Sequence, residues 1–545
     1  MVSQLSFSSS PVAATANGST VSITSKISGP GGNYSLTTNV TGNNGVPASY
    51  LLTPSGSTLT GGSSPPTVTI TYAYDKLNRL TSKTYTDGTP TVTYWYDGTT
   101  PTGCSPTLTI TNGIYRRTAM CDGPGWEAWS YNQTGRLLDD RRSTASLVKD
   151  ALYAPNLDGS DASITYPITS RIITYTPGQA GLPLSASDGT TNYATAAHYT
   201  PQGALASLTN NGNIYSTFIY NSRLQPCWNY ATTGTALPWN TTLCTGTATT
   251  GGILDLKYNF DLGAGDNGNV FGITNNRDIT RSQAFVYDSL NRIQTAGTVN
   301  ASGTNCWGET YGIDAWANLS SLALPSSYSS SCSHETPFSY TIPNSNQLPS
   351  ASGFTYDAAG NLMASGLGNY VYNAEHQMTS VTVGGLTTTY SYDGDGKRVE
   401  KSGGKIYWHG GGPEALDETD LSGNTNNSTF SEYVFFGGKR VARRDYQSNI
   451  YYYFADHLGT SREMVEAGQT TPCYDADFYP YGGENAHTTT CTQNYKFTGK
   501  ERDSSQTSIT SVQDTTPATL GDSSRLTGQP NRNPFRTAFQ PTRRA

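Results

Sequence analysis

The chain has 545 residues, with 33 Lys and Arg against 40 Asp and Glu, and only 13% of its residues are charged. The net charge of -7 excludes the broad basic surface typical of nucleic-acid-binding proteins. No stretch approaches the roughly 18 apolar residues of a membrane span, and MVSQLSFSSSPVAATANGST lacks the regions of a secretory signal. Abundant Tyr, Thr and Gly favour strands and turns, so we expect an all-β protein.

The N-terminal text predicts a separate β segment over residues 1–70. It is rich in Ser, Thr and Gly, as in SSSPVAATANGSTVSITSKISGPGG, and suggests weak strands. It lacks the motif that marks the rest of the chain.

A short motif recurs over residues 71–444. Its frame is Tyr, usually Asp or Asn, two free positions, usually Gly or Asn, one more free position, and then Leu, Ile or Met. Thr200 and His376 depart from the frame. The copies are YDKLNRL from Tyr74, YNQTGRL from Tyr131, YTPQGAL from Tyr199, YDSLNRI from Tyr287, YDAAGNL from Tyr356 and YNAEHQM from Tyr372, with looser copies YNSRL from Tyr220 and YDGDGKRV from Tyr392.

Each copy predicts a β-hairpin. The text before the Tyr alternates as a strand does, the Asp or Asn can accept backbone hydrogen bonds in the turn, and the Gly or Asn tolerates a left-handed conformation. A lone hairpin is marginal in water, so we expect the copies to pair edge to edge into one long coiled antiparallel sheet with ladders of Tyr rings. The expected structural residues are Tyr74, Asp75, Tyr131, Tyr287, Asp288, Tyr356, Asp357, Gly360, Tyr372, Asn373, Tyr392 and Asp393.

The eight cysteines fall into four pairs in chain order, and each pair closes a short loop. None forms CxxC, which disfavours zinc ribbons and redox motifs. Buried thiols and disulfides both fit, and the hairpin-sized spacings favour disulfides in an oxidising compartment. The pairs are Cys104 with Cys121, Cys227 with Cys244, Cys306 with Cys332, and Cys473 with Cys491.

A second block spans residues 445–503. It contains three ordered motifs, YYYFADHLGTSREMV from Tyr451, YDADFYPYGGE from Tyr474 and YKFTGKERD from Tyr495. The repeats resemble the YD repeats of the RHS family, which also occur in teneurins and in the shell of insecticidal toxin complexes. The second block resembles the start of the RHS repeat-associated core domain. The residues that carry this likeness are Asp456, His457, Leu458, Gly459, Tyr479, Tyr481, Gly482, Phe497, Gly499, Glu501, Arg502 and Asp503.

The text of residues 504–545 departs from the family. When Ser508–Ser523 is written in permitted codons and shifted by two bases, it yields YYFGARYYSSDTGRF, the continuation that the resemblance implies. We therefore expect these residues to be an out-of-frame, disordered tail that begins near Ser504.

No catalytic or metal site stands out from the sequence. His457 lies beside an Asp but has no second His at ligand spacing, so a turn is favoured over a metal site. The acids Asp417, Glu418 and Asp420 could suggest a glycosidase, but we interpret them as a solvated loop. We expect no cofactor and no enzymatic activity, because in the family activity lies beyond the core motifs.

The resemblance implies a spiral shell that encloses a polypeptide. We expect a non-catalytic shell of a secreted or surface protein whose partners are a C-terminal toxin cargo, absent from this text, and a secretion apparatus. One alternative is an adhesin that binds surface glycans, in which Trp126, Trp129, Trp307 and Trp316 could stack on sugars, although core packing is the commoner role. Another alternative is a non-functional gene fragment.

Overall fold

The structure is a computed structural model that describes residues 12–17, 20–25, 68–241, 244–245, 252–343 and 345–503. The chain divides into two units, Met1–Ile70 and Thr71–Ala545. In the first unit β1 (Val12–Asn17) and β2 (Thr20–Ser25) pair as an antiparallel hairpin. The expected tail 504–545 lies outside the described residues.

The second unit begins with a sheet of 21 strands that follow one another in chain order, each antiparallel to the next. These strands are β3 (Ile70–Tyr74), β4 (Leu80–Tyr85), β5 (Val92–Tyr96), β6 (Arg117–Cys121), β7 (Gly125–Tyr131), β8 (Leu137–Thr144), β9 (Leu147–Pro155), β10 (Asp161–Thr165), β11 (Ile172–Pro177), β12 (Pro183–Ser187), β13 (Asn192–Tyr199), β14 (Leu205–Asn210), β15 (Ile214–Tyr220), β16 (Pro226–Thr232), β17 (Gly252–Asn259), β18 (Gly272–Asn275), β19 (Gln283–Tyr287), β20 (Ile293–Thr298), β21 (Gly308–Ile313), β22 (Leu319–Ala323) and β23 (Phe338–Ser339).

A second sheet of 14 strands follows, also in chain order. The text between the sheets contains Pro343 and Pro349, which cannot donate ladder hydrogen bonds. The strands are β24 (Thr355–Tyr356), β25 (Leu362–Ala364), β26 (Gly368–Tyr372), β27 (Met378–Val383), β28 (Leu386–Tyr392), β29 (Arg398–Lys401), β30 (Lys405–His409), β31 (Ala415–Thr419), β32 (Ser431–Phe436), β33 (Lys439–Asp445), β34 (Ile450–Ala455), β35 (Ser461–Glu466), β36 (Tyr474–Phe478) and β37 (Glu484–Thr489).

The described residues contain no α-helix, which confirms the all-β fold of long antiparallel sheets. Single 3-10 turns are η2 (Gln179–Gly181), η3 (Ile279–Arg281), η4 (Ser350–Ser352) and η5 (Phe497–Gly499). The expected boundary at residues 444/445 falls at the end of β33, inside the second sheet, and stays a prediction.

The Asp or Asn of each repeat organises its turn. Asp75 Oδ1 accepts hydrogen bonds from the N–H groups of Leu77 (2.8 Å) and Arg79 (2.9 Å). Four residues after the repeat tyrosines, Asn78 and Gly360 have φ of 58° and 89°. The same pair of side-chain bonds recurs at Asn132, Asn221, Asp288, Asp314, Asp357, Asn373, Asp393, Asp445 and Asp456.

The repeat tyrosines join successive hairpins through their hydroxyls rather than through the stacked rings that we expected. The Tyr131 hydroxyl donates to the carbonyl of Arg117 (2.6 Å), on the preceding hairpin. Such a bond satisfies a buried hydroxyl and contributes about 1 kcal/mol. The same contact is made from Tyr96 to Leu80, Tyr199 to Pro183, Tyr220 to Leu205, Tyr287 to Val270 and Tyr392 to Met378.

A position that we treated as free, one residue after the left-handed residue, also links neighbouring repeats. Arg79 binds its own Asp75 (2.7 Å) and reaches Asp97 of the next turn (2.7 Å). Arg292 likewise binds Asp288 and donates to a carbonyl of the next turn. Because consecutive strands are antiparallel, these turns all fall on one edge of the sheet, where they contact one another.

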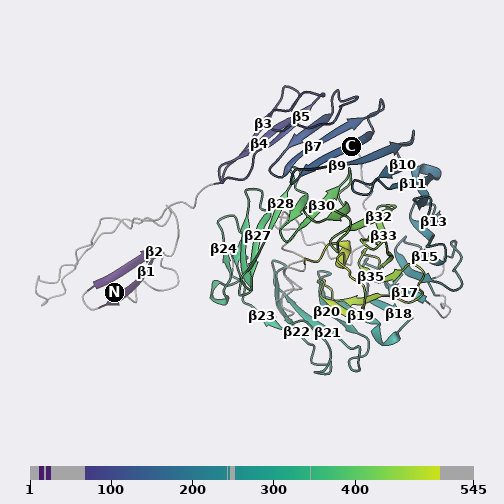
Figure 1. The fold of residues 1–545 in the computed structure, drawn as a ribbon. Helices are drawn as coiled ribbons and strands as arrows, with labels where there is room; N and C mark the ends of the chain where they lie inside the picture. The colour runs from purple at the N-terminus through teal and green to yellow at the C-terminus, as the bar shows by residue number, and fades with distance from the viewer. Residues whose placement is uncertain are drawn as a thin grey trace, which may run out of the picture. The chain divides into compact units, whose positions relative to one another are not determined.

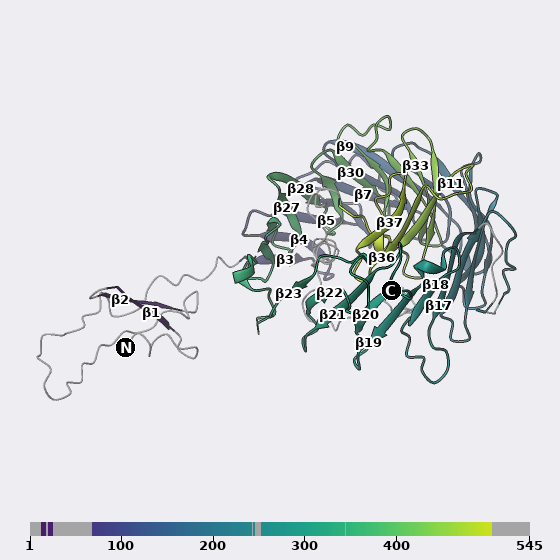
Figure 2. The same cartoon turned by 90° about the horizontal axis from the view of Figure 1, so that it is seen from below.

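The second sheet lies within the curve of the first. Figures 1 and 2 show the strands from β30 to β35 inside the arc formed by β9 to β20. One hydrophobic cluster contains buried residues of both sheets, among them Ile173 and Leu256 from the first and Val434 and Tyr452 from the second. Consistent with this position, β31 and β36 are buried on both faces.

All eight cysteines form disulfides, in the chain-order pairs that the spacing favoured. The cysteines of each bridge are 17 to 26 residues apart. Cross-links over loops of this length typically add about 2–4 kcal/mol.

Replacing Gly360 with Val tests the turn. Gly360 has φ of 89°, and an added Cβ would meet nothing within 4 Å, so only backbone strain is at issue. A left-handed β-branched residue costs about 1–2 kcal/mol, and we expect the urea midpoint of unfolding to fall accordingly. Gly360→Asn is the control, because Asn78 holds the same position, and it should change stability much less. Equal effects of the two substitutions would contradict this account.

Candidate functional site: the seam between the two sheets

Turns and strands of the second sheet meet the first sheet along a line that we call the seam. Residues later in the first sheet contact residues later in the second sheet. The two sheets therefore run side by side in the same chain order. Four hydrogen bonds mark this line, and the sequence separation of their partners falls from 300 at the first to 199 at the last. The second sheet, which lies inside, therefore uses fewer residues than the first to cover the same stretch. These bonds join Tyr94 to Gly394 (2.7 Å), Tyr153 to Gly411 (2.8 Å), Tyr166 to Tyr433 (2.7 Å) and Tyr258 to His457 (3.3 Å).

Two buried arginines form the densest ionic contact of the seam. Arg281, in η3 of the first sheet, binds Asp475 and Asp477 of β36, each at 2.7 Å. Arg462 of β35 also contacts Asp477. The guanidinium fork can satisfy two carboxylates at once, which favours arginine over lysine here. Charged residues within the strand segments SREMVE and YDADF, in a chain poor in charge, are the sequence feature that could have indicated this contact.

Burial and charge act in opposite directions on the acids of this contact. Burial favours the protonated form of Asp477, but Arg462, His487 and Arg281 hold its pKa well below the ordinary value. Glu463 lies beside Arg277, and burial raises its pKa to about 8 despite that guanidinium. Asp477 is therefore ionised at neutral pH, whereas Glu463 is protonated there.

Residues 495–503 cross the second sheet as a strap. Glu501 accepts from Lys405 (2.9 Å) and the Tyr407 hydroxyl (2.9 Å). Asp503 accepts from the Tyr390 hydroxyl (2.7 Å). Burial opposes the charge of Glu501, but Lys405 and Arg398 lower its pKa. Glu501 and Asp503 thus attach the strap to β28 and β30.

The other core-motif residues lie at two places. Arg502 pairs with Glu484 (2.7 Å) at the strap, while Phe497 packs on Phe478 and lies against Gly482. Gly499 approaches the carbonyl of Gly459. At the seam, the ring centroid of Tyr479 is 4.9 Å from that of Trp307, that of Tyr481 is 5.1 Å from that of Tyr311, and Leu458 packs on the shared core.

Asp456 and His457 form a turn of the repeat type. Asp456 Oδ1 accepts from the N–H groups of Leu458 and Thr460, as the repeat aspartates do. The His457 ring lies 4.4 Å from that of Tyr258, and burial lowers the pKa of the imidazole to about 4. His457 is therefore neutral at physiological pH and packs in the seam. The described residues contain no cluster of His, Cys, Asp and Glu that could hold a metal ion.

Some of the predicted repeat residues lie at the seam, and the others lie along the edge of the sheet that carries the repeat turns. Asp393 and its neighbour Gly394 meet the first sheet, where the Gly394 N–H donates to Asp122 (3.0 Å). Burial and then Glu127 raise the pKa of Asp393 to about 6. The remaining repeat tyrosines are the last residues of their strands, and the remaining Asp, Asn and Gly residues lie in the turns that follow.

One sequence interpretation is wrong. Asp417 and Glu418 are not in a solvated loop, because both are fully buried in β31; only Asp420 follows it in a turn. They belong to successive positions of a strand and so face opposite sides. Of the four tryptophans considered for sugar stacking, Trp126, Trp129 and Trp307 are buried and Trp316 is exposed.

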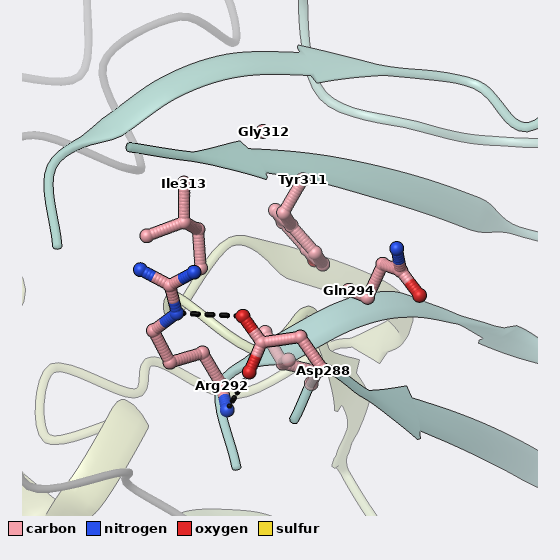
Figure 3. Close-up of a pocket in the computed structure, with 7 residues that line it drawn as sticks. Asp288, Arg292, Gln294, Tyr311, Gly312 and Ile313 are labelled. Atoms are coloured by element: carbon pink, nitrogen blue, oxygen red, sulfur yellow. Dashed lines mark hydrogen bonds and ion pairs between the residues drawn. The ribbon is translucent and has the colours of Figure 1, made fainter. Parts of the chain in front are cut away.

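A small cavity of about 280 Å³ lies where the turn between β19 and β20 meets β21. Figure 3 shows Arg292 bound to Asp288, with Tyr311 and Ile313 reaching in from the neighbouring strand. Burial alone would raise the pKa of Asp288, but the hydrogen bonds that Arg292 donates lower it below the ordinary value. Asp288 is satisfied within its own turn, so this cavity does not offer a free acid for catalysis.

The chain is similar in fold to solved chains of Tc toxin complexes. A structure titled TcdB2-TccC3-Cdc42 aligns with a TM-score of 0.61 at 15% identity, over 81% of this chain and 24% of that one. TcdB2-TccC3 aligns at 0.59 with 16% identity, over 81% and 25%. A Photorhabdus luminescens Tc holotoxin pore aligns at 0.56 with 14% identity, over 80% and 25%. The chain thus spans about a quarter of the length of these chains.

No family model matches the sequence. No curated protein matches it either. Within the described residues, no helix is long and apolar enough to cross a membrane.

Replacing Arg281 with Met tests the seam. The substitution keeps an apolar stem but leaves Asp475 and Asp477 buried without this guanidinium, and such a loss costs about 3–5 kcal/mol. We expect a large fall in the urea midpoint. Lys500→Met removes an exposed lysine that contacts Glu414 at 3.4 Å and should cost less than about 1 kcal/mol. Similar losses in the two variants would contradict the role of Arg281.

Proposed function

We propose that this chain is an enclosing wall of the RHS type, which surrounds a polypeptide toxin cargo and takes no catalytic part. The observation that carries the proposal is the nested arrangement, in which the second sheet is held inside the curve of the first by the seam. Similarity of fold to toxin-complex chains supports it. Enclosure needs a continuous surface rather than a reactive group, and the buried charge of Arg281 serves to join the two sheets.

We further propose that the protein works outside the cytoplasm, as a secreted or surface protein. Four disulfides support an oxidising environment. The proposed partners are the cargo and the apparatus that exports the protein. The family assignment and the out-of-frame text after Asp503 remain part of this proposal, and sequencing of the underlying DNA tests the latter.

Protease protection tests enclosure. An unstructured passenger polypeptide is fused after Ala545 of the full chain and treated with a nonspecific protease. We expect the passenger to survive much longer than the same peptide in free form. The Arg281→Met fusion should lose this protection if it still folds, and the Lys500→Met fusion should keep it. Rapid digestion of the passenger on an intact wild-type chain would refute the proposal.

Glycan binding is the second candidate, and one observation favours it. Trp239 is 47% exposed and stacks on His198 with ring centroids 4.9 Å apart, so one indole face is supported and the ring remains accessible. Aromatic faces of this kind bind the apolar faces of sugars. We expect binding on a glycan array to be lost in Trp239→Ala and kept in Trp316→Ala. Absence of glycan binding by the wild-type chain would exclude this function.

A further inference from the structure

Two carboxyl groups meet at the centre of the seam. Asp417 of β31 and Glu432 of β32 are directly opposite in the ladder, and both are fully buried. Opposite residues of an antiparallel pair project from the same face, with Cβ atoms about 4.5–5.5 Å apart. That face meets the connection between β10 and β11, where the N–H of Ile168 donates to Asp417 Oδ2 (3.0 Å) and the Thr169 hydroxyl donates to Glu432.

The surrounding charges do not balance these acids. Arg171 Nε donates to Glu432 Oε1 (2.8 Å), and its Nη1 donates to Asp188 Oδ2 (2.5 Å). One guanidinium is therefore shared by two carboxylates, and no ion pair to Asp417 is formed among the described residues. Lys149 acts on Asp417 only as a more distant charge.

Among residues 68–241, 252–343 and 345–503, the other neighbours of the pair supply no further positive charge. On β30 the ladder partner of Asp417 is Trp408, and on β31 the adjacent Glu418 faces the strap. Tyr166 donates to the carbonyl of Tyr433, and Tyr193 donates to Asp188 (3.0 Å). These hydroxyls are satisfied and remain neutral, because burial raises the pKa of each tyrosine.

One oxygen of the pair has no partner. Asp417 Oδ1 is buried and receives no hydrogen bond from any residue that the structure describes. An ionised carboxylate in this position would carry a large desolvation cost, whereas a protonated one can donate its O–H to the opposite acid. Burial and then the charge of Glu432 raise the pKa of Asp417 well above its ordinary value. Burial also raises the pKa of Glu432, although Thr169 and Arg171 oppose it.

We propose that Asp417 and Glu432 share one proton in the folded protein and that this proton helps to hold the seam closed. The pair joins β31 and β32 to the β10–β11 connection. When the shared proton is released to solvent, three carboxylates, those of Asp417, Glu432 and Asp188, surround Arg171. Repulsion then separates the two sheets at this point. The shared proton is argued from the ladder position, the burial and the missing hydrogen bond of Asp417, independently of the proposed function; the consequence that enclosed cargo becomes accessible rests on the proposed function.

The direction of the pH dependence follows from linkage. The unfolded chain releases the Asp417 proton near pH 4, whereas the folded chain keeps it to a higher pH. Between these limits the folded state binds more protons, so stability falls as pH rises. The contribution of the pair is complete below about pH 4 and is lost as pH passes the raised pKa of Asp417.

Asp417→Asn tests the proposal, because the amide reproduces the shape and the donor of the protonated acid. We expect its urea midpoint to fall less than that of wild type as pH rises from about 6 to about 9, because the Asp417 contribution is removed, with a gain over wild type at the alkaline end. Asp87→Asn, at an exposed turn, should leave the pH dependence unchanged. An unaltered pH dependence in Asp417→Asn would overturn the proposal.

A second measurement avoids reliance on the variant. Carbon-13 NMR of the wild-type chain labelled at Asp carboxyl carbons should show a resonance that stays in the protonated position at neutral pH. Its disappearance in Asp417→Asn assigns it, or, if that variant does not fold, its shift in Glu432→Gln does. Titration of every Asp carboxyl below about pH 5 would refute the shared proton. If the proton is present but the fused passenger is unprotected, only the proposed function fails.

Discussion

The structure depends on the hydrogen bonds by which an Asp or Asn side chain closes the turn of nearly every repeat. A single hairpin cannot stand alone in water, so each turn must also be joined to its neighbour. The tyrosine before the Asp binds the preceding hairpin, and the polar residue after the left-handed position reaches a neighbouring turn. These three contacts use residues within one short motif, and they explain why so small a unit can be repeated into sheets of many strands.

Nesting of one sheet inside the other introduces a second constraint. Strands such as β31, β35 and β36 are buried on both faces, so their charged residues must find partners inside the protein. Arg281 and Arg462 supply those partners at one end of the seam, whereas Asp417 forms no ion pair within the described part of the chain. Buried charges add little net stability when paired, whereas removing one partner of such a pair is strongly destabilising. We therefore interpret the ionic contacts of the seam as interactions that align the second sheet with the first.

The sequence alone predicts the hairpins well, because the turn contacts are local. The all-β fold, the disulfide pairs and the left-handed residue at Gly360 all follow from short-range pattern. The seam could not be predicted, since it joins residues up to 300 positions apart. Asp417 and Glu418 show the reason. A segment rich in acids is expected to be exposed to solvent, and its burial becomes evident only when the sheet that covers it is known. His457 likewise gains its meaning from Tyr258, which lies far away in the chain.

Zero-length cross-linking tests the nested arrangement most directly. Lys83 of β4 and Glu375 of the second sheet form an ion pair at 2.8 Å, 292 residues apart, and both are partly accessible. A carbodiimide should convert this pair into an amide, and mass spectrometry should recover one peptide joining the two positions, absent in Glu375→Gln. Recovery of cross-links between sequence neighbours alone, with no product joining Lys83 to the second sheet, would contradict the account.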